Sequence, residues 1–263
     1  GLIGGSFAGA FYKQGIEIYG FDLNPASLSA GAASEWFEGL TDEFDRFIKF
    51  PLDIIYICLP VSAAIDFINR LGKAGYKGAV TDACSVKSSV VEHARNNGLL
   101  FCGGHPIKGK ETSGFNNADA SLFSGAKHIL TPHEENGLTE PLKRLHTSIG
   151  MDVRIMDADC HDKIFADISH LPHLISFCLM DTVASLNKEA LQYAGGGFMD
   201  FTRIAASDPI MWKDIFLDNR DAILKSAENL EKDIAKWKRL IIDGNGDTLL
   251  GLLEKVSGDR RKI

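Results

Sequence analysis

The sequence predicts an α/β domain built on a parallel sheet, followed by an all-α helical domain. Up to about residue 156, short apolar runs alternate with helical patterns, which is typical of parallel strands joined by right-handed crossover helices. From Ala158 onward, the apolar residues recur with helical spacing almost to the end of the chain. We therefore expect one domain at residues 1–156 and a second at residues 157–263.

Six apolar runs of the first domain are candidates for strands. They are Ile16–Phe21, Asp53–Leu59, Ala79–Ala83, Leu99–Cys102, His128–Leu130 and Met151–Ile155. The run at 53–59 is apolar on both faces, as in a central strand of a parallel sheet. Helices are expected between strands at Val61–Ala74 and Val86–Asn96.

The helical pattern of the second half is interrupted at two glycine-containing stretches, 195–197 and 243–247. The helices expected there are Ile164–Leu186, Glu189–Tyr193, Pro209–Asp243 and Thr248–Val256. The last two carry more apolar residues than a thin helical domain readily buries. Because large apolar patches usually mark interfaces, we expect this half to form a homodimer.

Composition excludes several classes of protein. The 263 residues are 45% hydrophobic and 24% charged, which is usual for a globular protein of one large or two modest domains. The net charge of −7 argues against a general nucleic-acid binder, and no stretch approaches the roughly 20 apolar residues of a membrane span. The five cysteines are dispersed, which indicates reduced thiols and predicts a cytoplasmic protein.

A glycine-rich segment at the start of the chain, Gly1-Leu-Ile-Gly4-Gly5-Ser6, precedes a helical pattern at Phe7–Gln14. If a strand precedes it, as we expect, this is the second part of the GxGxxG fingerprint of Rossmann-type domains, in which glycines let the backbone approach a pyrophosphate. Asp22 follows the next strand, where a carboxylate binds the ribose hydroxyls of NAD and repels the 2′-phosphate of NADP. The residues expected to bind NAD are Gly1, Leu2, Ile3, Gly4 and Asp22. A strand–helix turn without a ligand is the alternative.

Four further segments carry chemically active residues. They are Thr81–Lys87 (TDACSVK), His105–Gly114 (HPIKGKETSG), Ser169–His173 (SHLPH) and Gly195–Arg203 (GGGFMDFTR), the last followed by Met211-Trp212. With the glycine-rich start, they make the chain resemble the prephenate dehydrogenase family over essentially its whole length. The resemblance implies NAD-dependent oxidative decarboxylation of prephenate to 4-hydroxyphenylpyruvate in tyrosine biosynthesis, or the same reaction on arogenate, by a homodimer.

His105 is the residue that we expect to act on the substrate hydroxyl. It follows the strand at 99–102 and so lies at a carboxyl end of the sheet, where ligands of α/β proteins bind. Oxidation of a secondary alcohol needs a hydrogen-bond acceptor at the hydroxyl, and a histidine that titrates near neutral pH suits that role. The matching histidine of the family has this place.

The resemblance places Ser85 beside His105 and the nicotinamide. On the residues alone, Ser85 is nearly as well explained as a cap for the helix expected at 86–96. The preceding residue, Cys84, stands where the family usually has glycine, which leaves the shape of this loop open.

Arg203 is expected to bind a substrate carboxylate, because its planar guanidinium donates two parallel hydrogen bonds that lysine cannot imitate. Alternatively, it lies on a helix surface and pairs with Asp200 or Asp208. The resemblance includes Asp200 among the residues that orient the site, and it places Glu111 at the mouth of the site. On composition alone, Glu111 is a solvated loop charge.

His170 and His173 are three residues apart and therefore share one face of a helix. The resemblance places this segment at the substrate pocket, and the sequence leaves open which histidine points inward. With Asp167 one turn earlier, the pair could also hold zinc. We expect no metal site, because the reaction needs none and no further ligand cluster accompanies the pair.

Two other functions fit the same architecture. A β-hydroxyacid or 6-phosphogluconate-type dehydrogenase should carry a catalytic lysine on the first long helix of the second domain, and the helix expected at 164–186 contains none. A regulatory module that senses NAD would bind the nucleotide without turnover, since a fold alone does not prove activity.

Overall fold

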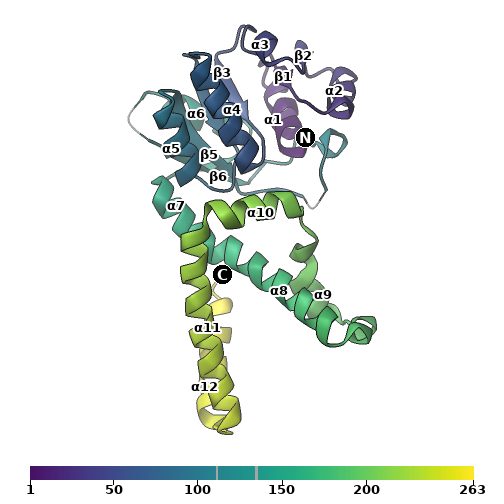
Figure 1. Ribbon diagram of the computed structural model, residues 1–263, viewed down its shortest axis with the longest axis vertical. Helices are drawn as coiled ribbons and strands as arrows, with labels where there is room; N and C mark the ends of the chain where they lie inside the picture. Colours follow the sequence, from purple (N-terminus) through teal and green to yellow (C-terminus); the bar gives the residue numbers. More distant parts are fainter. Residues whose placement is uncertain (111, 134–135) are drawn as a thin grey trace.

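The computed structural model describes residues 1–110, 112–133 and 136–263, and it shows an α/β domain joined to a largely helical domain (Figure 1). A five-stranded sheet of order β3-β4-β5-β6-β7 forms the centre of the first domain, and β1 pairs with β2 in a separate sheet. The strands are β1 (Tyr19–Phe21), β2 (Gly39–Thr41), β3 (Ile54–Ile57), β4 (Ala79–Asp82), β5 (Leu100–Pro106), β6 (Lys127–Pro132) and β7 (Asp152–Ile155). The expected fold class is confirmed.

One pair of strands is antiparallel, contrary to the expectation of a wholly parallel sheet. β5 runs against β6, with Cys102 opposite Pro132, whereas the other described pairs are parallel. The described part of the β5–β6 connection contains the 3-10 turn η1 (Phe115–Asn117) and no crossover helix. A parallel pair requires a crossover, and an antiparallel pair does not.

Six helices accompany the strands of the first domain. They are α1 (Leu2–Tyr12), α2 (Pro25–Ala32), α3 (Phe44–Phe47), α4 (Val61–Lys73), α5 (Ser88–Asn96) and α6 (Thr139–Ser148). The patterns predict α1, α4 and α5 and miss α2, α3, α6 and strand β2. Helix α2 consists mostly of small residues, and its signal is the cap: the Asn24 side chain accepts the N–H of Ala26 at 2.9 Å.

Helix α1 begins at Leu2 rather than at Phe7, so Gly4 lies in its first turn. A Cβ at Gly4 would lie 3.2 Å from the Cβ of Cys58, directly after β3, which shows how closely α1 passes the end of that strand. Glycine permits this close contact between helix and strand, as the third glycine of a Rossmann fingerprint does.

The two faces of the central sheet are covered by different helices. Alternate residues of β3 point to opposite faces: Ile55 and Ile57 pack with α4 and α5, whereas Tyr56 packs with α1. Burial of such an aliphatic side chain stabilises a fold by roughly 1.5–3 kcal/mol. The two clusters together fix the carboxyl ends of the strands, where the candidate site lies.

The second domain consists of consecutive helices. They are α7 (Ala158–Phe165), the π-helical turn η2 (Ala166–His170), α8 (Leu171–Leu186), η3 (Lys188–Tyr193), α9 (Gly196–Thr202), η4 (Arg203–Ala206), α10 (Pro209–Asp218), α11 (Arg220–Ile242) and α12 (Gly246–Arg260). In Figure 1, α11 and α12 pack together as one arm, and α8 and α9 form another. None of the described helices combines the length and the apolar character that crossing a membrane requires.

The helix expected at 209–243 is two helices, separated at Asn219. The backbone of Asn219 leaves the helical conformation, and its side-chain amide donates to the carbonyl oxygen of Asp162 at 2.8 Å. Apolar periodicity continues through this position, so only the tertiary contact marks the break.

Candidate active site

A buried ion pair between Asp82 and Lys87 stands at the carboxyl end of β4. The Lys87 ammonium also donates to the carbonyl oxygen of Gly104 at 2.7 Å, and Asp82 accepts the N–H groups of Gly104 at 2.8 Å and of Cys84 at 2.9 Å. A Cβ at Gly104 would lie 2.5 Å from the Asp82 carbonyl oxygen, so glycine is required there. The pair thus fixes the loop after β4 against the part of β5 that precedes His105.

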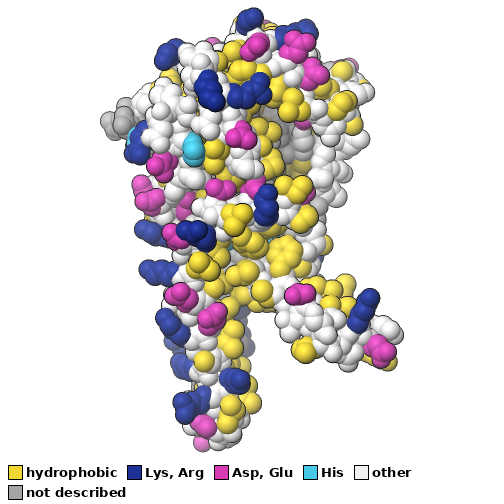
Figure 2. All heavy atoms as spheres, viewed as in Figure 1, with side chains coloured by type: hydrophobic (Ala, Val, Ile, Leu, Met, Phe, Trp, Pro, Cys, Tyr) yellow, Lys and Arg dark blue, Asp and Glu magenta, His cyan; other side chains and the backbone are white. Residues whose placement is uncertain are grey.

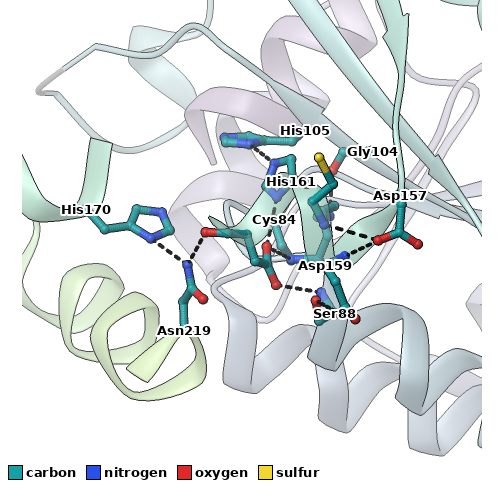
Figure 3. Close-up of polar contacts among 12 residues, drawn as sticks. Cys84, Ser88, Gly104, His105, Asp157, Asp159, His161, His170 and Asn219 are labelled. Carbon is teal, nitrogen blue, oxygen red and sulfur yellow. Dashed lines mark hydrogen bonds and ion pairs between the residues drawn. The ribbon is translucent and has the colours of Figure 1, made fainter. Parts of the chain in front are cut away.

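His105 lies within β5, which continues through Pro106 instead of ending at Cys102 as expected. It stands opposite Ile129 of β6 and beyond the last paired residue of β4, so it remains at the carboxyl edge. Its Nδ1 lies 2.8 Å from Nε2 of His161 on α7 (Figure 3). The residue expected to act on the substrate hydroxyl therefore bonds to the helical domain at the junction of the two domains.

The chain of hydrogen bonds continues from His161 to Asp162. His161 Nδ1 lies 2.8 Å from Asp162 Oδ1, and the two carboxylate oxygens accept the backbone N–H groups of Lys87 and Ser88, each at 2.8 Å. Helix α5 has no cap from its own N-cap residue, so Asp162 caps it across the domain junction. The sequence patterns single out neither His161 nor Asp162, because their partners lie 56 to 75 residues away.

The pKa of His105 lies well below its ordinary value of 6.5. Burial is the main cause, and four basic neighbours add to it: His161, Lys87, His128 and His170. Burial also lowers the pKa of His161, although its hydrogen bond to Asp162 opposes the shift. Both imidazoles are therefore uncharged at neutral pH, and His105 is able to accept a proton there.

Ser85 lies in the loop between β4 and α5 and is partly exposed. The alternative that it caps the helix is wrong, because α5 begins at Ser88 and its first N–H groups bond to Asp162. The neighbouring Cys84 needs no glycine-like backbone: among the described residues, only glycines have a positive φ. A role for Ser85 beside the substrate stays a prediction.

His170 ends the π-helical turn η2 and is 1% exposed. Its Nδ1 lies 3.0 Å from Nδ2 of Asn219, and the same amide nitrogen donates to the Asp162 carbonyl, so Asn219 is the donor to His170. A neutral His170 consequently carries its proton on Nε2, which is buried and has no hydrogen-bond partner among the described residues. A buried N–H without a partner is suited to donate to a ligand, and π-helical turns are frequent at functional sites.

His173 lies in the first turn of α8, where its ring stacks on Trp212 of α10 with 3.6 Å between centroids. Its Nδ1 lies 2.8 Å from the carbonyl oxygen of Ser169, to which it donates. Burial lowers the pKa of His173, and the positive charge of Arg203 adds to the shift. Of the two histidines, His170 presents the unused donor and His173 packs on Trp212.

Arg203 is the first residue of η4, and its side chain is exposed. Ser176 of α8 donates to the carbonyl oxygen of Phe201 at 3.1 Å, which holds the end of α9 and the adjoining η4 against α8. Because the Arg203 charge acts on His173, the structure brings these two expected substrate residues together. Asp200, one turn earlier on α9, is exposed.

Two further expectations concern Glu111 and a metal. Glu111 lies outside the described residues. Asp167, considered above as a zinc ligand, accepts a hydrogen bond from Ser226 at 2.5 Å. Within residues 1–110, 112–133 and 136–263, no three His, Cys, Asp or Glu side chains are grouped as metal ligands.

A cavity of about 620 Å³ runs between β1 and β3, and Gly1, Gly4 and Asp22 are among the residues that line it. The side chains of Leu2 and Ile3 pack in the core, so only their backbone N–H groups, at the positive end of α1, are available to a phosphate. These features fit a dinucleotide.

Both parts of the chain match models of known protein domains. Residues 7–154 match the model described as prephenate dehydrogenase, nucleotide-binding domain. Residues 157–255 match the model described as prephenate dehydrogenase, dimerization domain.

Individual proteins of known name are similar over nearly the whole chain. Prephenate dehydrogenase of Lactococcus lactis subsp. cremoris is 34% identical over 247 residues, which are 89% of this chain and 67% of that protein. The crystal structure of Aquifex aeolicus prephenate dehydrogenase with hydroxyphenyl propionate and NAD+ has a TM-score of 0.93 at 35% identity, covering 99% of this chain and 94% of that one. The structure of Synechocystis arogenate dehydrogenase has a TM-score of 0.85 at 26% identity, covering 99% and 96%.

Proposed function

Because the chain belongs to the prephenate dehydrogenase family and is an NAD-dependent dehydrogenase, we propose that it converts prephenate to 4-hydroxyphenylpyruvate in tyrosine biosynthesis. The observation that carries the proposal is His105, an uncharged imidazole at the carboxyl edge of the sheet that bonds to the helical domain. An acceptor at this point is what oxidation of the substrate hydroxyl needs.

The proposed reaction divides the work between the cofactor and the side chains. The chemistry that bound NAD supplies is acceptance of the hydride from the carbon that bears the hydroxyl. His105 accepts the hydroxyl proton, so that this carbon becomes a carbonyl. The ring carboxylate then leaves as CO2, and its bonding electrons complete the aromatic ring while the carbonyl oxygen takes up a proton. The junction between the domains holds the reacting groups in line.

We assign the cofactor to the backbone at Gly1, Leu2, Ile3 and Gly4, with Asp22 at the ribose. The positive end of α1 supports this assignment, since it attracts a pyrophosphate, and Asp22 lines the same cavity. The Asp22 carboxylate favours NAD over NADP, because it repels a 2′-phosphate.

For the substrate we assign Arg203 to a carboxylate and the buried Nε2–H of His170 to a second acceptor. The first assignment is supported by the charge of Arg203, which acts on the neighbouring His173. The second is supported by Nε2 of His170, which has no hydrogen-bond partner among the described residues. We place His173, which stacks on Trp212, beside Arg203 at the substrate. For Asp200, Glu111 and Ser85 we propose the roles that the family resemblance implies.

Arogenate is the second candidate substrate, and the similarity to an arogenate dehydrogenase structure favours keeping it. The two compounds differ only in a keto or an amino side chain. Incubation of the purified protein with NAD and either compound, followed by NADH absorbance, distinguishes them. Turnover with prephenate in clear preference supports the proposal. NAD binding without reduction by either compound contradicts it and indicates an NAD-sensing module.

A homodimer is part of the proposal, and the helical domain is its expected interface. This half matches a dimerization-domain model. Figure 2 shows hydrophobic side chains along the arm of α11 and α12, where Leu230, Ile234, Trp237, Ile241 and Ile242 line a groove. We place the enzyme in the cytoplasm, because its five cysteines are free thiols.

A further inference from the structure

Asp162 is a pure acceptor at the centre of the domain junction. Burial alone would raise the pKa of its carboxyl group, but the hydrogen bonds from His161, Ser88 and Lys87 outweigh burial, and the pKa is lowered. An ionised carboxylate has no proton to donate. In the 2.8 Å contact between Asp162 and His161, the proton therefore belongs to Nδ1 of His161.

The nitrogen of His161 that carries the proton determines which nitrogen of His105 is protonated. A neutral imidazole has one N–H, so with Nδ1 protonated, Nε2 of His161 is an acceptor. That Nε2 lies 2.8 Å from Nδ1 of His105. Two lone pairs would repel each other at this distance, so Nδ1 of His105 must be the donor.

We infer that His161 and Asp162 are positioning residues that hold His105 in its Nδ1–H tautomer, which leaves the lone pair of Nε2 for the substrate hydroxyl. This inference rests on the proposed role of His105 as the acceptor. The opposite tautomer would present an N–H to the hydroxyl and could not take its proton. The arrangement extends a rule known from other sites, in which a carboxylate behind a histidine sets its tautomer.

Packing holds the two rings in this arrangement. The ring of His161 is fully buried and stacks on Phe165 with 4.4 Å between centroids, and the ring of His105 lies 4.9 Å from the same phenyl ring. Asp162 cannot turn away from His161 without uncapping α5, because its oxygens also accept the N–H groups at the start of that helix. The cap that joins the domains thus also orients the proposed acceptor.

Asp162→Asn is the variant that reverses the chain of tautomers. Oδ1 of Asp162 contacts both His161 and the N–H of Lys87, and Oδ2 accepts the N–H of Ser88, the first residue of α5. With the amide oxygen kept at the Oδ2 position for Ser88, the amide nitrogen takes the Oδ1 position, gives up the hydrogen bond from Lys87 and donates to Nδ1 of His161. His161 then carries its proton on Nε2, and His105 carries its own on Nε2 as well. We expect kcat to fall by about 10²–10⁴-fold with little change in KM, because the acceptor is lost and substrate contacts are kept.

Nitrogen-15 NMR of histidine-labelled protein without substrate reads the tautomer directly. The His105 signals are assigned by their loss in His105→Asn. In the unmodified protein, we expect a protonated Nδ1 and an unprotonated Nε2, and in Asp162→Asn the reverse. Asp162→Glu keeps a carboxylate and should restore the original pattern in part. A protonated Nε2 in the unmodified protein, or an unchanged pattern in Asp162→Asn, would overturn the inference.

Asp214→Asn is the matched control. Asp214 is a buried carboxylate of the helical domain that caps α4, as Asp162 caps α5, but it has no contact with His105 or His161 among the interactions of the described residues. Its variant should lose stability like Asp162→Asn and keep the His105 tautomer. A tautomer change in this control would mean that domain docking alone sets it, against the inference. Because the NMR measurement needs no turnover, absence of NAD reduction would contradict the proposed function and leave the tautomer result to decide the inference separately.

Discussion

Asp214 of α10 accepts two hydrogen bonds from Ser62 in the first turn of α4, one from the backbone N–H at 3.2 Å and one from the hydroxyl at 2.5 Å. The carboxylate is 3% exposed, and α4 has no cap from its own N-cap residue, Pro60. Asp162 does the same for α5. Two helices of the α/β domain therefore have their positive ends neutralised by carboxylates of the helical domain.

This double cap explains why the candidate site lies at the domain junction. Each cap contributes about 1 kcal/mol in typical helices, and both act at the carboxyl edge of the sheet. The cap from Asp162 holds α7, with His161, over the end of β5, with His105. The cap from Asp214 holds α10 against the start of α4. The orientation of the two domains and the geometry of the site are thus set by the same contacts.

Replacement of His105 by asparagine should lower kcat by about 10²–10⁴-fold and leave KM almost unchanged, because the acceptor acts only as charge develops on the hydroxyl. Steady-state assays with NAD and prephenate measure both constants. His93→Asn on α5 is the control and should behave like the unmodified protein. Equal losses of binding for His105→Asn and Arg203→Gln, with turnover retained, would make His105 a recognition residue.

The pH profile follows from the surroundings of His105. Its pKa is lowered by burial and then by His161, Lys87, His128 and His170, so the imidazole stays neutral below pH 6.5. We expect kcat to remain constant from neutral pH down through ~6.5 and to fall only at lower pH. A fall in kcat centred at pH 6.5 would show that His105 titrates as if it were exposed.

Arg203→Gln should raise KM by a factor on the order of 10–10³ with a smaller effect on kcat, because a carboxylate held equally in substrate and transition state contributes uniform binding. Arg144→Gln, on the exposed surface of α6, controls for loss of one positive charge. The expectation fails if kcat falls in Arg203→Gln while KM stays constant.

Asp22→Asn should narrow the preference for NAD over NADP, since it removes a charge that repels the 2′-phosphate. The ratio of kcat/KM for the two cofactors measures the preference. Asp152→Asn, on β7 and exposed, should leave the ratio unchanged. Equal kcat/KM for NAD and NADP in the unmodified protein would contradict the expected role of Asp22.

Light scattering at micromolar concentration should give the mass of a homodimer. Ile241 on α11 is 66% exposed, and Ile241→Glu should shift the protein toward monomer because it places a charge in an apolar interface. Leu23→Glu, at a 68% exposed position of the α/β domain, should leave the dimer intact. A monomer in the unmodified protein contradicts the expectation.

Acid should destabilise the fold through His146. Its ring is buried, donates from Nδ1 to the Leu142 carbonyl and accepts at Nε2 from the Tyr56 hydroxyl, and burial lowers its pKa to about 4. The unfolded chain binds this proton at ~6.5, so stability is complete above that pH and is lost as pH falls toward 4, by about 2 kcal/mol at pH 5. Urea denaturation at pH 7.5 and pH 5 measures the loss.

The matching control is His146→Gln, which removes the titrating group. In that variant the difference in unfolding free energy between the two pH values should shrink by the contribution of His146. His128, which is also buried and stacks on His146 with 3.8 Å between centroids, still contributes to the pH dependence of stability in this variant. If the difference in unfolding free energy between the two pH values is the same in His146→Gln, groups other than His146 cause the loss of stability in acid.

The sequence by itself determined the class of fold and the residue types of the site. Strand positions are local signals, because apolar β-branched runs predict strands without knowledge of their partners, and all six expected strands are present. His105 could be placed at the carboxyl edge because it closely follows a local apolar run, although the strand itself continues to Pro106. The four motifs, in their order, were sufficient to identify the family.

Only the tertiary structure decided how these residues are joined. The antiparallel β6, the break at Asn219, the caps from Asp162 and Asp214, and the His161 behind His105 all depend on contacts between segments far apart in the chain. No periodicity or motif encodes such a contact. A hydrogen bond requires its atoms to lie within about 3 Å of each other, and only the folding of distant segments against one another, within and between the two domains, brings them to that distance.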